Sequence, residues 1–221
     1  PRYRPLDELM EADSVTLHVP LTRSGQDATV HLFGTDRIRA IKRGSVLINT
    51  SRGAVVDSNA LLQALESKRI SAAVLDVWEN EPDIPVELLE RTFIATPHIS
   101  GYSLDGKLNA AEAVYGEVCR YLGIMPSWKR AKADDEPKEI RVTDSNVQGI
   151  LRDAVRQAYN IEMDDSALKE IAGLPREQQA KHFTKLRATY RVRREFAAYR
   201  VVLEPLQCVA KKALQELGFA V

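Results

Sequence analysis

Reactive and charged side chains gather in three short segments, each of which follows a strand-like run. The segments are residues 49–57, 75–82 and 96–102, and they contain Arg52, Glu81 and His98. An imidazole changes its charge near neutral pH, so His98 suits proton transfer to or from a bound molecule. The planar guanidinium of Arg52 offers paired donors and suits a carboxylate better than a lysine would, and Gly53 after it leaves room for a bound molecule to approach closely. These residue types indicate acid–base chemistry on a small molecule that carries a carboxylate.

Short apolar runs alternate with helical patterns and predict the elements that position these residues. Strands are expected at residues 15–19, 45–49, 72–76 and 93–96. Helices are expected at 6–12, at 35–42 with Thr35 as N-cap and Gly44 beyond the end, and at 58–68, opened by Asp57 or Ser58. This alternation predicts βαβ units and a parallel sheet, and we expect an α/β fold with a partial doubly wound parallel sheet. Ligands of such sheets bind at the carboxyl ends of the strands, where the three segments begin.

The second half of the chain has a different character. Residues 105–122 form a helical pattern with an apolar stripe, and residues 125–143 are polar, charged and contain two prolines. Helices at 145–160, 165–173, 175–190 and 205–217 and a strand at 196–203 are expected beyond them. We therefore expect a domain at 1–124, a linker at 125–143 and a smaller α+β domain at 144–221. A tail of about 80 residues folds alone only marginally, so it is expected to dock on the first half or on another subunit.

Composition excludes several classes of partner. Lys plus Arg equals Asp plus Glu at 31 each, so no global charge attracts nucleic acid or a membrane surface. No apolar run approaches the roughly 20 residues of a spanning helix. Cys119 and Cys208 lie in apolar runs without metal-ligand spacing. They are interpreted as core thiols of a cytoplasmic protein, and no metal is expected.

Four motifs in register resemble one family. They are LHVPLT at 17–22, NTSRGAVVD at 49–57, LDVWENEP at 75–82 and TPHISGY at 96–102. Residues 6–124 are therefore similar to the D-isomer-specific 2-hydroxyacid dehydrogenases. The resemblance implies a Rossmann-like cofactor domain, NAD as cofactor and oxidation of a 2-hydroxy acid. Residues 1–124 would then be the C-terminal part of an NAD-binding and catalytic domain.

The resemblance also implies roles for single residues. His98 would take the proton of the C2 hydroxyl as hydride leaves for the nicotinamide, Glu81 would hold the imidazole, and Arg52 would bind the substrate carboxylate. Asp76 would hold the nicotinamide carboxamide; the alternative is a buried carboxylate that caps nearby amides. The implied cofactor-binding residues are Val19, Thr50, Ser51, Arg52, Asp76 and Gly101.

Further features are similar to one branch of the family, which oxidises 4-phosphoerythronate to 2-oxo-3-hydroxy-4-phosphobutanoate during pyridoxal phosphate synthesis. They are YSLDGK at 102–107, LDVWENEP at 75–82 and LRATYRVRRE at 186–195, the last being similar to a dimerisation domain. The branch implies a small phosphorylated 2-hydroxy acid as substrate and a homodimer formed through residues 144–221. Tyr102 would contact the acid. Arg187, in a run of six basic residues and best placed by helical spacing against Tyr190 and Arg194, would reach the phosphate or belong to a solvated basic face.

The dinucleotide fingerprint GxGxxG does not occur in the sequence, and the chain starts at a proline. We therefore expect it to begin partway through the cofactor domain, and the sequence does not separate NAD from NADP. Three alternatives remain open. They are a phosphoglycerate dehydrogenase, whose tail would show a βαββαβ pattern, a nucleotide-sensing corepressor, and a non-catalytic dimerisation fragment.

Overall fold

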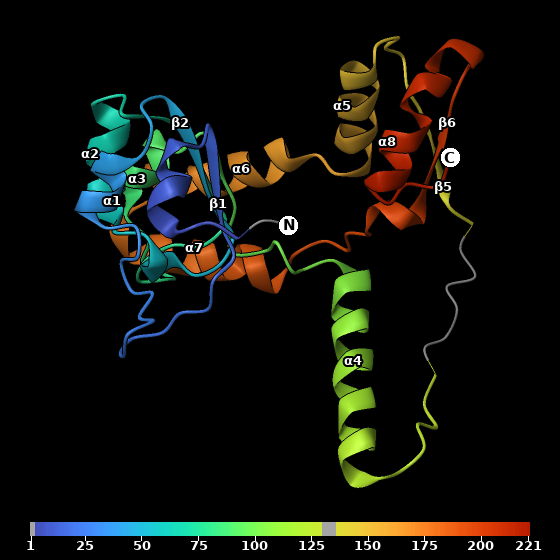
Figure 1. The fold of residues 1–221 in the computed structure, drawn as a ribbon, viewed down its shortest axis with the longest axis horizontal. Coiled ribbons are helices and arrows are strands. Elements are labelled where there is room, and N and C mark those ends of the chain that lie inside the picture. Colours follow the sequence, from blue (N-terminus) through green and yellow to red (C-terminus); the bar gives the residue numbers. More distant parts are fainter. Residues whose placement is uncertain (1–2, 130–135) are drawn as a thin grey trace. The chain divides into compact units, whose positions relative to one another are not determined.

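A four-stranded parallel sheet carries the three chemically distinctive segments. The computed structural model describes residues 3–129 and 136–221. The sheet has the order β1 (Ser14–Leu17), β2 (Ser45–Asn49), β3 (Ile70–Leu75) and β4 (Ile94–Ala95), and Figure 1 labels β1 and β2. All four expected strands form, and β2 has the expected bounds. Regular structure in β4 stops at Ala95, but the Thr96 amide still donates to the Leu75 carbonyl at 2.9 Å.

One 3-10 helix precedes β1, and further helices lie in the connections between neighbouring strands of this α/β unit. They are η1 (Leu6–Glu11), α1 (Thr35–Ala40), η2 (Gly53–Val55), α2 (Ser58–Glu66) and α3 (Val86–Arg91). Asp57 is the N-cap of α2 and accepts from the amides of Asn59 and Ala60, which agrees with one of the two expected caps. Gly34, and not Thr35, precedes α1. Crossovers between neighbouring parallel strands are right-handed, so α1, α2 and α3 cover the same face of the sheet (Figure 1).

Two helices from the tail belong to the same unit as the sheet. The described residues divide into unit 1, residues 3–100 and 162–190, and unit 2, residues 101–129, 136–161 and 191–221. Unit 1 thus includes α6 (Ile161–Lys169), η3 (Glu170–Gly173) and α7 (Arg176–Ala188). Leu168, Ile171 and Phe183 are fully buried in the core that also contains Leu75 and Ala95. This division differs from the expected ranges because these apolar side chains pack on the sheet.

Unit 2 has its own small core. Its elements are α4 (Leu104–Leu122), β5 (Lys138–Arg141), α5 (Val147–Ala158), η4 (Phe196–Ala198), β6 (Tyr199–Val202), η5 (Pro205–Ala210) and α8 (Lys211–Glu216). Strands β5 and β6 pair in parallel, although β5 lies within the expected linker. The rings of Phe196 and Phe219 stack with centroids 4.5 Å apart. Cys119 is buried as expected, whereas Cys208 is exposed, so the interpretation of Cys208 as a core thiol was wrong.

The packing of α7 on the sheet can be tested by truncating its buried ring. We expect Phe183→Ala to destabilise unit 1 by about 3–5 kcal/mol, because the change removes a fully buried side chain and leaves a cavity. Urea unfolding followed by the fluorescence of Trp78, in a Trp128→Phe background, reports on unit 1 alone, since the chain has two tryptophans. The control is Met163→Ala, at a side chain that is 57% exposed, which should change stability by less than about 0.5 kcal/mol. Equal small effects of both variants would contradict this packing.

Candidate active site

His98 and Glu81 form a hydrogen-bonded pair beside the carboxyl ends of β3 and β4. The imidazole Nδ1 lies 2.7 Å from Glu81 Oε2, and the two side chains are 30% and 19% exposed. The other oxygen, Glu81 Oε1, accepts from the Trp78 amide at 2.8 Å. An ionised carboxylate only accepts, so Nδ1 carries the hydrogen in this pair. The pair therefore leaves the imidazole Nε2 to exchange a proton with a substrate.

Asp76 fixes the loop that carries His98. Its carboxylate is 3% exposed and accepts from the Thr96 hydroxyl at 2.6 Å and from the amides of Ile99 at 2.8 Å and Ser100 at 3.0 Å. These donors flank His98, whose φ of 56° lies in the left-handed region. This is the alternative role, a buried carboxylate capping amides. Contact with a nicotinamide carboxamide remains a prediction for Asp76.

A buried asparagine organises the Arg52 loop. Asn49 Oδ1 accepts from the Ser51 amide at 3.0 Å and from the Ser51 hydroxyl at 2.8 Å, while Asn49 Nδ2 donates to the Arg52 carbonyl at 3.0 Å. The Arg52 guanidinium is exposed and donates to the Ser51 carbonyl at 2.6 Å. Asn49 was not among the predicted site residues. A polar residue closing the apolar run 45–49 was the available signal.

Gly53 joins the Arg52 loop to the Glu81 loop. A Cβ at Gly53 would overlap the backbone carbonyl of Trp78. Glycine is therefore required here by the approach of residues 78–79, and not by the approach of a ligand, which the sequence had suggested. Trp78 is buried, and its indole donates to the Thr96 carbonyl at 3.0 Å. The same tryptophan thus links all three segments.

A second histidine–carboxylate pair supports this junction. Glu79 Oε1 lies 2.7 Å from His31 Nε2, and Glu79 Oε2 accepts from the Ser58 amide at 2.8 Å, at the first turn of α2. Burial raises the pKa of the Glu79 carboxyl, but the hydrogen bonds from His31 and Ser58 outweigh burial, so the net pKa is lowered from its usual 4.5. Glu79 lies two residues before Glu81. The pair therefore anchors the loop that carries the partner of His98.

The remaining predicted cofactor residues fall in two places. Val19 and Thr50 are half-buried and Ser51 is buried, and all three follow β1 or β2 at the same sheet edge as Asp76 and His98. Gly101 begins unit 2 and is followed there by Tyr102, whose ring lies 4.2 Å from the Lys107 ammonium. Only unit 1 therefore carries the paired site residues described above.

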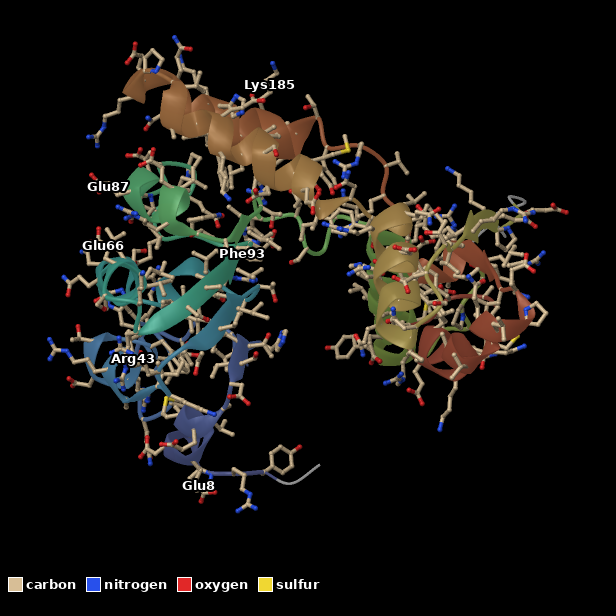
Figure 2. All side chains as sticks on the ribbon, turned by 90° about the horizontal axis from the view of Figure 1, so that it is seen from above. Glu8, Arg43, Glu66, Glu87, Phe93 and Lys185 are labelled. Atoms are coloured by element: carbon tan, nitrogen blue, oxygen red, sulfur yellow. The ribbon has the colours of Figure 1, made fainter. Side chains whose placement is uncertain are left out.

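The basic run at 181–194 does not form one helix face. Helix α7 ends at Ala188, so helical spacing does not relate Arg187 to Tyr190 or Arg194, contrary to the sequence interpretation. Arg187 is half-buried on α7, and Lys185 projects from the helix side away from the sheet (Figure 2). Arg194 binds Asp105 in unit 2 at 2.9 Å. The role of Arg187 at a phosphate remains a prediction.

Among residues 3–129 and 136–221, no group of three His, Cys, Asp or Glu side chains is arranged to hold a metal ion. In the same described ranges, no helix combines the length and the apolar character needed to cross a membrane.

Both parts of the sequence match family models. Residues 1–100 match the model "D-isomer specific 2-hydroxyacid dehydrogenase, NAD binding domain", and residues 134–218 match a domain of unknown function (DUF3410). The chain is 38% identical over 221 residues to the erythronate-4-phosphate dehydrogenase of Marinobacter nauticus, covering 98% of this chain and 57% of that protein. It is 40% identical to the enzyme of the same name from Bacteroides fragilis, covering 87% of this chain and 51% of that protein.

The chain thus spans just over half the length of these relatives. Among solved structures, a D-lactate dehydrogenase from Aquifex aeolicus complexed with NAD and lactic acid is 32% identical, with a TM-score of 0.47. That match covers 55% of this chain and 41% of the other.

The lowered pKa of Glu79 in its pair with His31 makes the free energy of unfolding depend on pH. The folded-state pKa of Glu79 is lowered, so its ionised form contributes stability that is present above 4.5 and is lost as the pH falls through the folded-state pKa. We expect Glu79→Gln to be less stable than the parent at pH 7, with a difference that shrinks below pH 4.5. Urea unfolding at several pH values measures this. Glu66→Gln, at an exposed carboxylate of α2 (Figure 2), is the control. A difference that does not depend on pH would contradict the assignment.

Proposed function

We propose that the protein is an NAD-dependent dehydrogenase, on the premise that residues 1–100 match the NAD-binding domain model of the D-isomer-specific 2-hydroxyacid dehydrogenases. Its proposed reaction is the oxidation of 4-phospho-D-erythronate at C2 to 2-oxo-3-hydroxy-4-phosphobutanoate, in pyridoxal phosphate synthesis. The observation that carries this proposal is the 2.7 Å pair of His98 and Glu81 at the carboxyl edge of a parallel sheet. Similarity to erythronate-4-phosphate dehydrogenases over 98% of the chain supports the choice of substrate.

The proposed mechanism assigns one task to each of three side chains. His98 Nε2 takes the proton of the C2 hydroxyl as the C2–H bond breaks and the C2=O bond forms. Glu81 holds the ring through Nδ1 and stabilises the imidazolium that results. Arg52 binds the substrate carboxylate and so orients C2. When bound, NAD supplies the acceptor for the hydride that leaves C2.

The residues at the sheet edge fit the nicotinamide end of such a cofactor. Val19, Thr50 and Ser51 follow adjacent parallel strands and would line it, with Gly101 and Asp76 as further contacts. The Asp76 carboxylate already accepts three hydrogen bonds from its own chain, so a carboxamide would have to share it. The sequence contains no GxGxxG, and these residues are proposed for the nicotinamide end alone.

Four finer features belong to the same proposal. Tyr102 would contact the acid group and Arg187 the phosphate, because phosphate recognition favours guanidinium donors. A homodimer formed through residues 144–221 is proposed from the motif at 186–195. A cytoplasmic location is proposed because both cysteines are free.

The proposed substrate is tested by comparing kcat/KM for two phosphorylated acids. The full-length protein should reduce NAD with 4-phosphoerythronate at a kcat/KM at least about 100-fold above that with 3-phosphoglycerate, because a site that pairs each substrate oxygen penalises an analogue lacking one. NADH formation followed by absorbance measures both reactions, and NADP in place of NAD tests cofactor choice. Turnover of neither acid would overturn the proposed function.

The acid–base pair is tested by isosteric changes. We expect His98→Gln to lower kcat by about 100- to 10,000-fold, because the general base is lost. Glu81→Gln should lower kcat by a smaller factor, because the base remains but loses its fixed tautomer. The matched control is His18→Gln, at an exposed histidine near the same sheet edge, which should keep kcat within about twofold. A fully active, folded His98→Gln enzyme would contradict the mechanism.

A further inference from the structure

Helix α6 binds the outer edge of β4 through side chains. β4 is the last strand of the sheet in the described residues and has only two residues, Ile94 and Ala95. The Ala95 amide donates to Asp165 Oδ1 at 2.7 Å, and Lys169 Nζ donates to the Phe93 carbonyl at 3.2 Å. Figure 2 shows Phe93 at the side of the sheet that faces the tail helices. Side chains of α6 therefore take the place that another strand would occupy.

The two α6 side chains form one unit. Asp165 and Lys169 are one helical turn apart, and Lys169 Nζ lies 2.8 Å from Asp165 Oδ1 and 3.0 Å from Oδ2. The Asp165 side chain is 18% exposed, and the neighbouring Leu168 is fully buried in the core of unit 1. Burial of Leu168 fixes the helix, and the lysine fixes the carboxylate. The Ala95 amide thus meets an oriented acceptor.

The bound strand leads directly to the proposed base. Ala95 precedes His98 by three residues, which span at most about 10 Å of extended chain. Between them, Thr96 is held by β3 through its amide and by Asp76 through its hydroxyl. A shift of β4 would strain the bonds of Thr96 and move His98 relative to Glu81, whose carboxylate also accepts from the Trp78 amide. Displacements of about 1 Å can cost two orders of magnitude in rate.

We propose that Asp165 and Lys169 of α6 are positioning residues that hold β4, and through it His98, in register with Glu81. The proposal rests on the proposed function for its kinetic meaning. It gives a role to a segment of the region that matches a domain of unknown function, since residues 134–218 include α6. In this view the tail helices are part of the catalytic unit.

The kinetic test uses two substitutions of Asp165 in the full-length enzyme. Asp165→Ala should lower kcat by about 10- to 100-fold while the KM for NAD stays within about twofold, because the loops after β1 and β2 are untouched. Asp165→Asn retains an oxygen that can accept from Ala95 and should restore kcat to within about threefold of the parent. The matched control is Tyr190→Phe, which removes a 2.8 Å bond to Asp164 on the same helix but leaves β4 alone, and it should keep kcat.

Two measurements keep this test independent of the substrate. Hydrogen exchange at the Ala95 amide should accelerate in Asp165→Ala and not in Asp165→Asn. The Nδ1–H signal of His98 in ¹⁵N-histidine spectra should weaken in Asp165→Ala. If the parent turns over neither phosphorylated acid, the proposed function fails, and these two signals still decide the positioning role.

Several results would overturn the proposal. A folded Asp165→Ala enzyme with parental kcat, or an Asn variant as impaired as the Ala variant, would do so. An unchanged His98 signal in Asp165→Ala would do so without any substrate. If Asp165→Ala does not fold, Lys169→Met decides, because it keeps the alkyl packing but loses the bond to Phe93. It should lower kcat at unchanged KM for NAD, and parental kcat would refute the idea.

Discussion

The buried carboxylate of Asp76 is the interaction on which the site depends. It lies at the end of β3 and accepts three hydrogen bonds from residues that flank His98. A hydrogen bond to a charged group contributes about 1.5–3 kcal/mol, and an isolated buried carboxylate would be strongly unfavourable. The buried Asp76 carboxylate therefore needs the hydrogen bonds that the loop donates, and the loop needs the carboxylate as their acceptor. Their mutual dependence holds His98 in a left-handed backbone conformation that presents its ring to Glu81.

Buried polar side chains also fix the loops after β2 and β3. Asn49 closes the loop after β2, and Glu79 pins the loop after β3 to the first turn of α2. Each of these side chains gives partners to backbone groups that would otherwise be buried without them. Gly53 then lets the two loops touch at the Trp78 backbone. Arg52 and Glu81 thus stand on loops that are in direct backbone contact, which matters for a reaction that depends on placement within fractions of an ångström.

Helices α6 and α7 add to unit 1 from a distant part of the sequence. A two-residue strand contributes few hydrogen bonds of its own, so β4 depends on what lies on each side of it. Strand β3 binds one side and Asp165 binds the other. The apolar residues of α6 and α7 enter the same core as the sheet, which explains why helices so far along the chain belong to the unit of the proposed base.

The sequence by itself determined the local features. Apolar runs predicted all four strands, with β2 correct to the residue, and Asp57 was recognised as a helix cap, because strand runs and caps depend on neighbours a few residues away. Motifs also predicted that Glu81 is the partner of His98. Only the tertiary structure decided which groups Asp76 binds, why residue 53 must be glycine, that α6 and α7 pack on the sheet, and that the basic run is divided between two units. These features depend on contacts between segments far apart in the chain, which local residue patterns do not encode.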